Sequence, residues 1–341
     1  MPSFVTLLLA FVMAAIVSAI VLFGLLKSGW SGQLLDLPVR ANAMHSVPVP
    51  RIGGLAMVLS VAASTVLIAQ ANPLECLLLS LAAALAALSY LDDRHGLPVW
   101  VRLPCHILAA TVAVIAIAAD EKASTAAPWL QLVFAAPLLV IGIAWVTNLF
   151  NFMDGSDGMA GGMALIGFAA LGLTAADAGA VDMATICLAV AGAALGFLRF
   201  NFPPARVFLG DAGSIPLGFL AATLGLYGTT AHLWDAWYPL LVFSPFVVDA
   251  TMTLLRRIAQ RERIWEAHRS HCYQRLILSG WSHRKTALAS YTLMFGAAIS
   301  AGIARRQGAP AAILAGWVVL YVLLLSFLEW RLRPKNKDNT K

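Results

Sequence analysis

Charged residues are scarce in this sequence. Only 12% of the 341 residues are Asp, Glu, Lys or Arg, whereas 60% are hydrophobic, and the mean hydropathy is +0.81. This composition, with repeated apolar runs of spanning length, argues against a soluble domain and indicates an all-α, polytopic membrane protein. The net charge of +6 gives no reason to expect nucleic acid as a partner, because the basic residues are explained by membrane topology below.

Cysteine patterns and linkers are also lacking. The four cysteines, Cys76, Cys105, Cys187 and Cys272, show no CxxC spacing, so neither a disulfide framework nor a zinc site is indicated. We find no low-complexity linker and no clear internal repeat, and therefore expect residues 1–341 to form a single membrane domain. The first apolar run has neither a basic segment before it nor a convincing cleavage site, which predicts a retained span.

The hydrophobic runs predict about eleven transmembrane helices, each near the ~20 residues that cross ~30 Å of hydrocarbon. The expected spans lie near residues 4–26, 53–70, 74–91, 101–119, 129–147, 159–176, 181–198, 213–231, 236–255, 287–304 and 310–330.

Lys and Arg set the predicted orientation. With the N-terminus outside, all but three of the 23 basic residues fall at inner ends, in inner loops or in the C-terminal tail, and the exceptions are Lys122, Arg305 and Arg306. This is the bias that the positive-inside rule expects. The C-terminus is then cytoplasmic, and residues 256–286 form a basic cytoplasmic loop.

Against this apolar background, polar motifs stand out. An ionised side chain inside a bilayer costs about 2.5 to 3.5 kcal/mol, so such residues usually face a cavity, a metal or a substrate path. The predicted topology puts the motifs at cytoplasmic helix ends or in the last cytoplasmic loop: Asp92 and Asp93; Asn148, Asn151, Asp154 and Asp157 with their neighbouring glycines; Asp211; and His268 with His271.

Each motif also has a purely structural interpretation. Asp92 and Asp93 before Arg94 are compatible with a solvated helix end, and Asn148 and Asn151 with hydrogen bonds between helices. The other motifs are compatible with turns at Asp154 and Asp157, an N-cap at Asp211 and interfacial histidines. None of these interpretations explains why separate segments place polar groups on one side.

The shared side favours a reaction between phosphate groups. A phosphorylated nucleophile and a nucleotide diphosphate repel each other, so an enzyme that joins them needs a divalent cation and basic groups. Mg²⁺ prefers one or two carboxylates with phosphate oxygens and water. The alternative is an ion-coupled membrane transporter, which should instead place its polar residues near the bilayer midplane and often in repeated halves.

The order and content of these motifs resemble a known family. The segments that carry the resemblance are His45-Ser-Val-Pro-Val-Pro-Arg51-Ile-Gly-Gly54, Leu91-Asp92-Asp93, Asn148-x-x-Asn151-x-x-Asp154-Gly-x-Asp157-Gly, Phe208-x-Gly-Asp211-x-Gly-Ser214 and His268-x-x-His271. They are similar to the successive cytoplasmic motifs of the polyprenyl-phosphate N-acetylhexosamine-1-phosphate transferases, also called glycosyl transferase family 4.

The resemblance implies a phosphoglycosyltransferase that moves an N-acetylhexosamine-1-phosphate from a UDP-sugar to undecaprenyl phosphate and releases UMP. It implies Mg²⁺ as cofactor, with Mn²⁺ as a substitute, and Asp211 as metal ligand. Asp92 and Asp93 would lie beside metal and lipid phosphate, where one of them could act as base. Asn151, Asp154 and Asp157 would hold the nucleotide, Asn148 would also bind substrate, and Phe208 would stack on uracil. Arg51, His268 and His271 would contact phosphates, and Asp154, His268 and His271 would count among the catalytic residues.

One departure from the family pattern narrows the substrate. The branch that uses muramoyl-pentapeptide carries three consecutive histidines, whereas Arg269 and Ser270 separate His268 from His271 here. The sequence looks closer to enzymes that begin O-antigen, capsule or related glycans in the bacterial inner membrane. The sugar stays open among N-acetylglucosamine, N-acetylfucosamine and N-acetylquinovosamine, and a homodimer stays open as an assembly.

Overall fold

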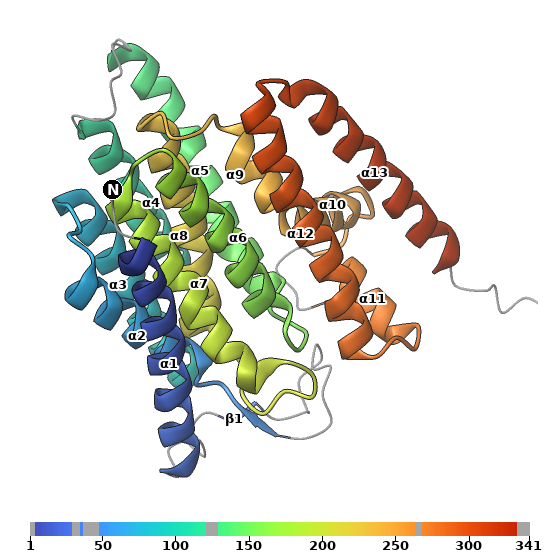
Figure 1. The fold of residues 1–341 in the computed structure, drawn as a ribbon. Helices are drawn as coiled ribbons and strands as arrows, with labels where there is room; N and C mark the ends of the chain where they lie inside the picture. Colours follow the sequence, from blue (N-terminus) through green and yellow to red (C-terminus); the bar gives the residue numbers. More distant parts are fainter. Residues whose placement is uncertain (1–3, 29–34, 37–47, 121–128, 264–267, 333–341) are drawn as a thin grey trace, which may run out of the picture.

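The computed structural model describes residues 4–28, 35–36, 48–120, 129–263 and 268–332. This part of the chain forms thirteen helices and one two-stranded sheet (Figure 1). Eight helices are long and apolar enough to cross a membrane, which confirms an all-α, multi-pass membrane protein. These are α1 (Phe4–Lys27), α3 (Pro73–His95), α4 (Val99–Ala119), α5 (Trp129–Phe152), α6 (Met159–Asp177), α7 (Val181–Asn201), α12 (His283–Gln307) and α13 (Pro310–Arg331).

Three of the eleven predicted spans differ from this set. α2 (Gly53–Ile68) has only 16 residues. α8 (Asp211–Thr230) is mostly buried inside the bundle and is not among the eight candidate spans. The single helix predicted over 236–255 is wrong, because the structure divides it into α9 (Trp237–Val242) and α10 (Ser244–Ala259). Three short elements were not predicted from the sequence: helix α11 (Cys272–Leu278) and strands β1 (Leu35–Asp36) and β2 (Val49–Pro50).

The break between α9 and α10 has a local cause at Pro245. Proline has no N–H to donate, and its ring crowds the carbonyl four residues earlier, which here belongs to Leu241. The Ser244 hydroxyl donates to that carbonyl at 2.7 Å and so satisfies it. The Ser244 hydroxyl also bonds the Tyr321 hydroxyl of α13 at 2.7 Å. The break is therefore fixed by hydrogen bonds to both sides.

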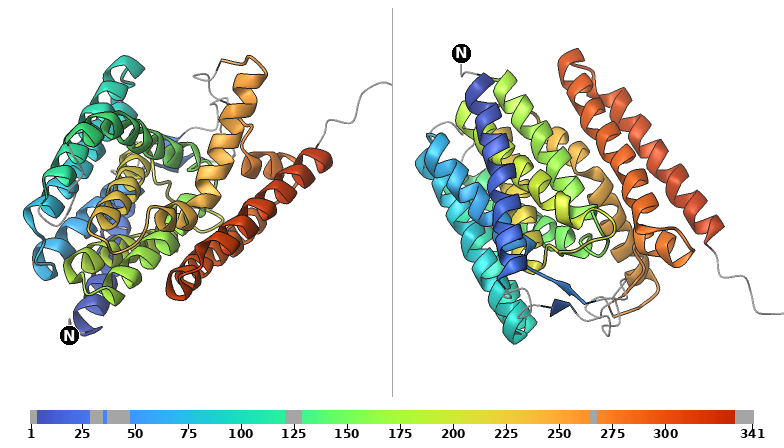
Figure 2. Two further views of the ribbon diagram at one scale, coloured as in Figure 1. Left: turned by 90° about the horizontal axis from the view of Figure 1, so that it is seen from above. Right: turned by 60° about the horizontal axis from the view of Figure 1, so that its bottom comes forward.

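Small residues bring the central helices together. α7 is the most enclosed of the candidate spans and lies beside α1 and α6 (Figures 1 and 2). A Cβ atom added at Gly192 of α7 would sit 2.0 Å from the Phe11 carbonyl oxygen of α1, which is far inside contact distance. Such close backbone approach at small residues is a common basis of helix association in membranes.

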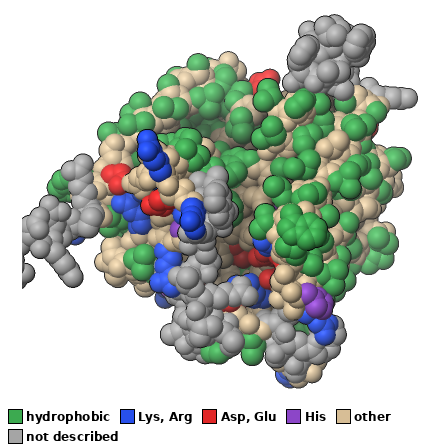
Figure 3. Space-filling view, turned by 180° about the vertical axis from the view of Figure 1, so that it is seen from behind, with side chains coloured by type: hydrophobic (Ala, Val, Ile, Leu, Met, Phe, Trp, Pro, Cys, Tyr) green, Lys and Arg blue, Asp and Glu red, His purple; other side chains and the backbone are tan. Residues whose placement is uncertain are grey.

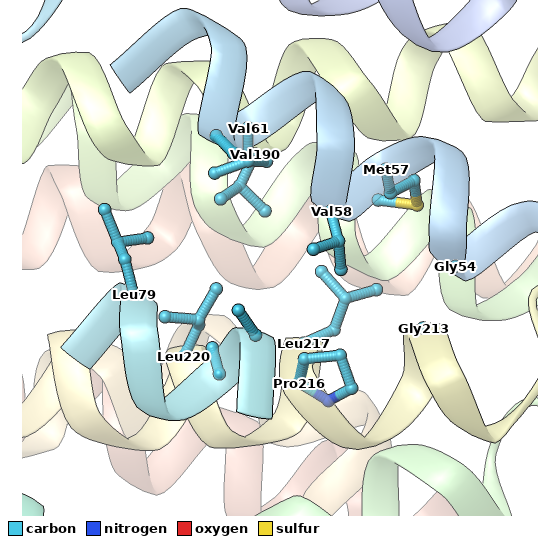
Figure 4. Close-up of a pocket in the computed structure, with 13 residues that line it drawn as sticks. Gly54, Met57, Val58, Val61, Leu79, Val190, Gly213, Pro216, Leu217 and Leu220 are labelled. Atoms are coloured by element: carbon cyan, nitrogen blue, oxygen red, sulfur yellow. The ribbon is translucent and has the colours of Figure 1, made fainter. Parts of the chain in front are cut away.

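The α12–α13 hairpin stands at the edge of the bundle, where none of the α13 residues is buried (Figure 2). On the opposite side of the molecule, an apolar crevice of about 490 Å³, counting its open mouth, lies between α2, α3, α7 and α8 (Figure 4). Its lining includes Met57, Leu79, Val190 and Leu220 and contains no ionisable side chain. Charged chemistry must therefore lie elsewhere.

Candidate active site

The chain around Arg51 is held against the segment that precedes α8. Arg51 forms a parallel bridge with Phe208. The Gly53 N–H donates to the Phe208 carbonyl oxygen at 2.9 Å, and the Gly54 N–H donates to the Leu209 carbonyl oxygen at 2.8 Å. The first N–H groups of a helix have no partner within it, so these bonds both cap α2 and fix Arg51 beside the start of α8.

Gly210 permits the approach of α3 to α8. Its φ of +73° is a left-handed conformation that favours glycine. A Cβ atom there would sit 3.2 Å from Asp93 Oδ2 and also crowd Arg51 Cβ. Because this position is open, the Asp211 N–H donates to Asp93 Oδ2 at 3.2 Å.

Two arginines hold the acidic side chains in place. Arg51 Nη1 lies 3.2 Å from Asp93 Oδ1, and Arg51 Nη2 lies 2.9 Å from Asp36 Oδ1. Arg102 of α4 pairs with Asp92, and its Nη1 is 3.9 Å from Asp211 Oδ2. The Asp36, Asp92, Asp93 and Asp211 carboxylates and these two guanidiniums form what we call the carboxylate cluster.

The α5–α6 loop closes one side of this cluster. Asn151 Oδ1 accepts from the Ser214 hydroxyl at 3.0 Å, and the Asn151 side chain also hydrogen-bonds Asp211. Burial raises the pKa of Asp154 well above its usual range, and the Asp211 charge raises it further, which puts Asp154 close to the cluster.

The neighbouring polar residues of this motif face other partners. Asp157 Oδ2 accepts from the Ala205 N–H at 2.9 Å, and Asp157 Oδ1 lies 3.7 Å from His283 Nδ1. Asn148 donates to the Ala144 carbonyl oxygen of its own helix at 2.7 Å and lies 3.5 Å from His106 Nδ1. The motif thus divides between the carboxylate cluster and its surroundings.

The two histidines form a separate group. Their ring centroids are 4.9 Å apart, and His271 Nδ1 lies 3.5 Å from Asp249 Oδ1. The His271 ring stacks on Phe152 at 6.3 Å between centroids. The Tyr273 hydroxyl donates to the Phe152 carbonyl oxygen at 3.0 Å, so the end of α5 connects the histidines to the loop that carries Asp154.

His268 is held as a neutral side chain. Burial lowers its pKa from the ordinary 6.5 to about 4, and the neighbouring His271 and Arg257 lower it in the same direction. Its Nδ1 lies 2.8 Å from the Ser270 hydroxyl. Near neutral pH this histidine supplies hydrogen bonding rather than positive charge.

The structure thus brings together one group of predicted residues: Arg51, Asp92, Asp93, Asn151, Asp154 and Asp211. His268 and His271 form a second group, and Phe152 at the end of α5 lies between the two, because its ring stacks on His271. Figure 3 shows acidic and basic side chains gathered in a recess low on one face, below a mostly hydrophobic surface. Phe208 joins the site through its backbone bridge to Arg51, and its side chain is partly exposed. His45 lies outside the described residues.

Sequence reasoning missed several partners of these residues. Asp36, Asp249 and His283 were not singled out, and Arg102 was counted only as a topology charge. A signal existed for Asp249, because it is a lone carboxylate inside the predicted span 236–255, and intramembrane carboxylates are usually functional. Asp36 and His283 carry no comparable local pattern.

The donor set suits a hard cation held jointly with substrate. Within the described ranges, no group of three His, Cys, Asp or Glu residues is arranged to hold a metal by itself. Mg²⁺ requires less from the protein, since it takes one or two carboxylates and completes its shell with phosphate oxygens and water. The oxygens of Asp211 and Asp93 fit that requirement.

Comparison with known proteins identifies relatives of this chain. Residues 75–229 match the family model for glycosyl transferase family 4. The chain is 30% identical to a probable undecaprenyl-phosphate N-acetylglucosaminyl 1-phosphate transferase of Bacillus subtilis, over 83% of this chain and 79% of the relative. It is 28% identical to a decaprenyl-phosphate N-acetylglucosaminephosphotransferase of Mycobacterium tuberculosis, over 82% and 79%.

A phospho-N-acetylmuramoyl-pentapeptide-transferase of Lacticaseibacillus paracasei is 30% identical, but over only 48% of this chain and 51% of the relative. The resemblance found in the motifs is thereby confirmed over most of the chain: the protein belongs to glycosyl transferase family 4 and is a homologue of the polyprenyl-phosphate N-acetylglucosamine-1-phosphate transferases.

Proposed function

We propose that this protein transfers an N-acetylhexosamine-1-phosphate from a UDP-sugar to undecaprenyl phosphate, giving a lipid-diphosphate sugar and UMP. The observation that carries the proposal is the carboxylate cluster, in which four acidic side chains share Arg51 and Arg102 at one end of an apolar bundle. The proposal is also supported by the relatives, whose names include a polyprenyl phosphate and N-acetylglucosamine.

In the proposed reaction, an oxygen of the lipid phosphate attacks the β-phosphorus of the UDP-sugar. The bond from that phosphorus to the bridging oxygen breaks, and UMP leaves with the electron pair. A phosphate monoester is already anionic near neutral pH, so holding it in line matters more than removing a proton. Asp92 or Asp93 would serve as base only for the monoprotonated lipid phosphate.

The side chains around the cluster have distinct roles in this proposal. Arg51 and Arg102 offset the negative charge of the incoming phosphates. Asp211, with Asp93 beside it, holds Mg²⁺, for which Mn²⁺ can substitute, and the ion supplies neutralisation of phosphate oxygens when bound. The four carboxylates remain organised without substrate because the two guanidiniums are already paired with them.

The nucleotide lies between the carboxylate cluster and the α5–α6 loop. Asn148, Asn151, Asp154 and Asp157 surround it, and the partly exposed Phe208 ring offers a face for uracil. His268 and His271 contact the diphosphate, with the neutral His268 acting through hydrogen bonds. Because Arg269 and Ser270 interrupt a triple-histidine run, the donor sugar is N-acetylglucosamine, N-acetylfucosamine or N-acetylquinovosamine rather than muramoyl-pentapeptide.

The proposed setting is the bacterial inner membrane with the carboxylate cluster on the cytoplasmic side, where UDP-sugars are made. The product would begin an O-antigen or a related surface polysaccharide. Support for the orientation comes from the basic residues Arg51, Arg94, Arg102, Arg256 and Arg275, which belong to the same end of the bundle as the cluster or the histidines.

The test is a panel assay with purified protein and undecaprenyl phosphate. Each of the three UDP-sugars is supplied with a radiolabelled sugar, and lipid-extractable label is measured. We expect one sugar to dominate, activity to vanish with EDTA and to return with Mg²⁺ or Mn²⁺, and Asp211→Asn to be inactive although folded. Equal activity of Asp211→Asn and wild type would remove the assigned metal ligand, and no transfer from any sugar would refute the function.

A further inference from the structure

The last helix, α13, reaches the histidines although it lies at the edge of the bundle. None of its residues is buried. Near its end, however, Glu329 contacts two arginines from other elements: Arg256 of α10 through Nη1 at 2.6 Å, and Arg275 of α11 through both carboxylate oxygens. These arginines stand on either side of residues 268–271, which we call the histidine segment.

A continuous series of hydrogen bonds leads from Glu329 into the histidine segment. Arg256 Nη1 pairs with Glu329, while Nη2 of the same guanidinium donates to the Ser270 carbonyl oxygen at 2.5 Å. The Ser270 hydroxyl lies 2.8 Å from His268 Nδ1. Because the guanidinium is planar and rigid, fixing one of its nitrogens on Glu329 fixes the direction in which the other points.

On the other side, Arg275 ties the start of α11 to the same carboxylate. Its Nη2 lies 3.1 Å from Glu329 Oε2 while Nη1 pairs with Oε1, which is the two-point geometry that makes arginine–carboxylate pairs directional. Arg275 is four residues beyond His271, and its N–H donates to the His271 carbonyl oxygen at 2.9 Å. Glu329 therefore holds two adjacent residues of the histidine segment, Ser270 through Arg256 and His271 through Arg275.

A second contact keeps α13 aligned with α10. The Tyr321 hydroxyl bonds the Ser244 hydroxyl at the break between α9 and α10. α13 thus contacts the first residue of α10, Ser244, through Tyr321. It contacts the last turn of α10, at Arg256, through Glu329. Isolated exposed ion pairs contribute little, but here one carboxylate is shared by two guanidiniums on a helix whose position is set independently.

We infer that Glu329 is a positioning residue, which orients His268 and His271 toward the diphosphate through Arg256 and Arg275. The link to the diphosphate rests on the proposed function, whereas the ordering of the histidine segment does not. Glu329 lies outside residues 75–229, which match the family model, and in none of the motifs that carry the resemblance.

The experiment compares Glu329→Gln with Asp177→Asn in the full-length protein in nanodiscs. Asp177 is a close control, since its side chain is 52% exposed against 49% for Glu329 and it also pairs with an arginine, Arg305 at 2.9 Å, away from the histidines. Two readouts are used: hydrogen exchange of residues 268–278, and kinetics of sugar-phosphate transfer alongside calorimetric affinity for UMP.

We expect Glu329→Gln to exchange faster over 268–278 and to lose about 5- to 10-fold in kcat, while UMP affinity stays within twofold. Glu329→Asp, which keeps the charge, should recover part of kcat, and Asp177→Asn should match wild type. Unchanged exchange in Glu329→Gln would overturn the inference whatever the activity. Parallel loss of UMP affinity and kcat would also overturn it, because general damage rather than positioning would be the cause. Faster exchange in a protein without transferase activity would refute the proposed function alone.

Discussion

The raised pKa of Asp154 makes the stability of the fold depend on pH. Its pKa is raised by burial and by Asp211, although Arg51 acts in the opposite direction. A carboxyl group with a raised folded pKa binds more protons in the folded than in the unfolded state. It therefore stabilises the fold below its ordinary pKa, and that stability is lost as the pH rises through the folded value.

The variant Asp154→Asn should reveal this cost. We expect the melting temperature of the variant to rise relative to that of the wild type as the pH increases from 5 to 8, since only the wild type must ionise a partly buried carboxyl group. We also expect transferase activity to be lost. Asp177→Asn, at an exposed ion pair with Arg305 at the other end of the bundle, is the control. A lower melting temperature of Asp154→Asn at pH 8 would contradict the explanation.

His268 gives a pH dependence of opposite sign. Its pKa falls from 6.5 to about 4 in the folded protein. Between these two pH values His268 is protonated in the unfolded chain but not in the folded protein. The stability of the fold therefore declines as the pH falls from 6.5 toward 4. We expect the loss of melting temperature between pH 7 and pH 5 to be smaller in His268→Gln than in wild type, with exposed His95→Gln unchanged. An equal loss in all three proteins would show that His268 titrates normally.

At the scale of elements, the break between α9 and α10 shows the limit of hydropathy. Pro104, Pro137 and Pro216 all lie inside continuous helices, so proline alone does not decide whether an apolar run breaks. At Pro245 the outcome depends on the Ser244 hydroxyl and its bond to Tyr321 of α13. Tyr321 is distant in sequence, and the run over 236–255 by itself therefore predicts one helix.

The site residues that were predicted carry a local sequence signal, whereas those that were missed are defined by contacts between distant segments. The motif residues such as Asp93 and Asp211 are recognisable because polar residues are locally unusual in an apolar sequence. Their partners come from other elements: Asp36 reaches Arg51 from β1, and Asp249 reaches His271 from α10. A strand of two residues shows no periodicity. The sequence therefore does not predict the pairing of β1 with β2, which directly precedes Arg51.

Close packing of α1 on α7 gives a prediction for the fold itself. Gly192→Ala would force a Cβ atom against the Phe11 carbonyl oxygen, and we expect a loss of about 1 to 3 kcal/mol. Gly142→Ala on α5 is the matched control, because nothing lies within 4 Å of the added atom. Melting temperatures in detergent report both changes. Equal stability of the two variants would show that α1 and α7 are less tightly packed.

At the scale of the whole molecule, the charge distribution predicts which end faces the cytoplasm. Single cysteines would replace the exposed Ser279, before α12, and the exposed Gln307, at its end, in a chain without its native cysteines. Because one membrane crossing separates them, an impermeant thiol reagent added to intact cells should label position 307 and not 279. Labelling of 279 from outside would reverse the proposed orientation.

The central claim is that the carboxylate cluster transfers a sugar phosphate, not a sugar alone. Its most direct test uses the preferred UDP-sugar labelled with ³²P at the β-phosphate, undecaprenyl phosphate, Mg²⁺ and purified protein. We expect the label to enter the lipid fraction while unlabelled UMP is released in equal amount, and we expect Asp211→Asn to do neither. Label recovered in released UDP, with only the sugar on the lipid, would contradict it.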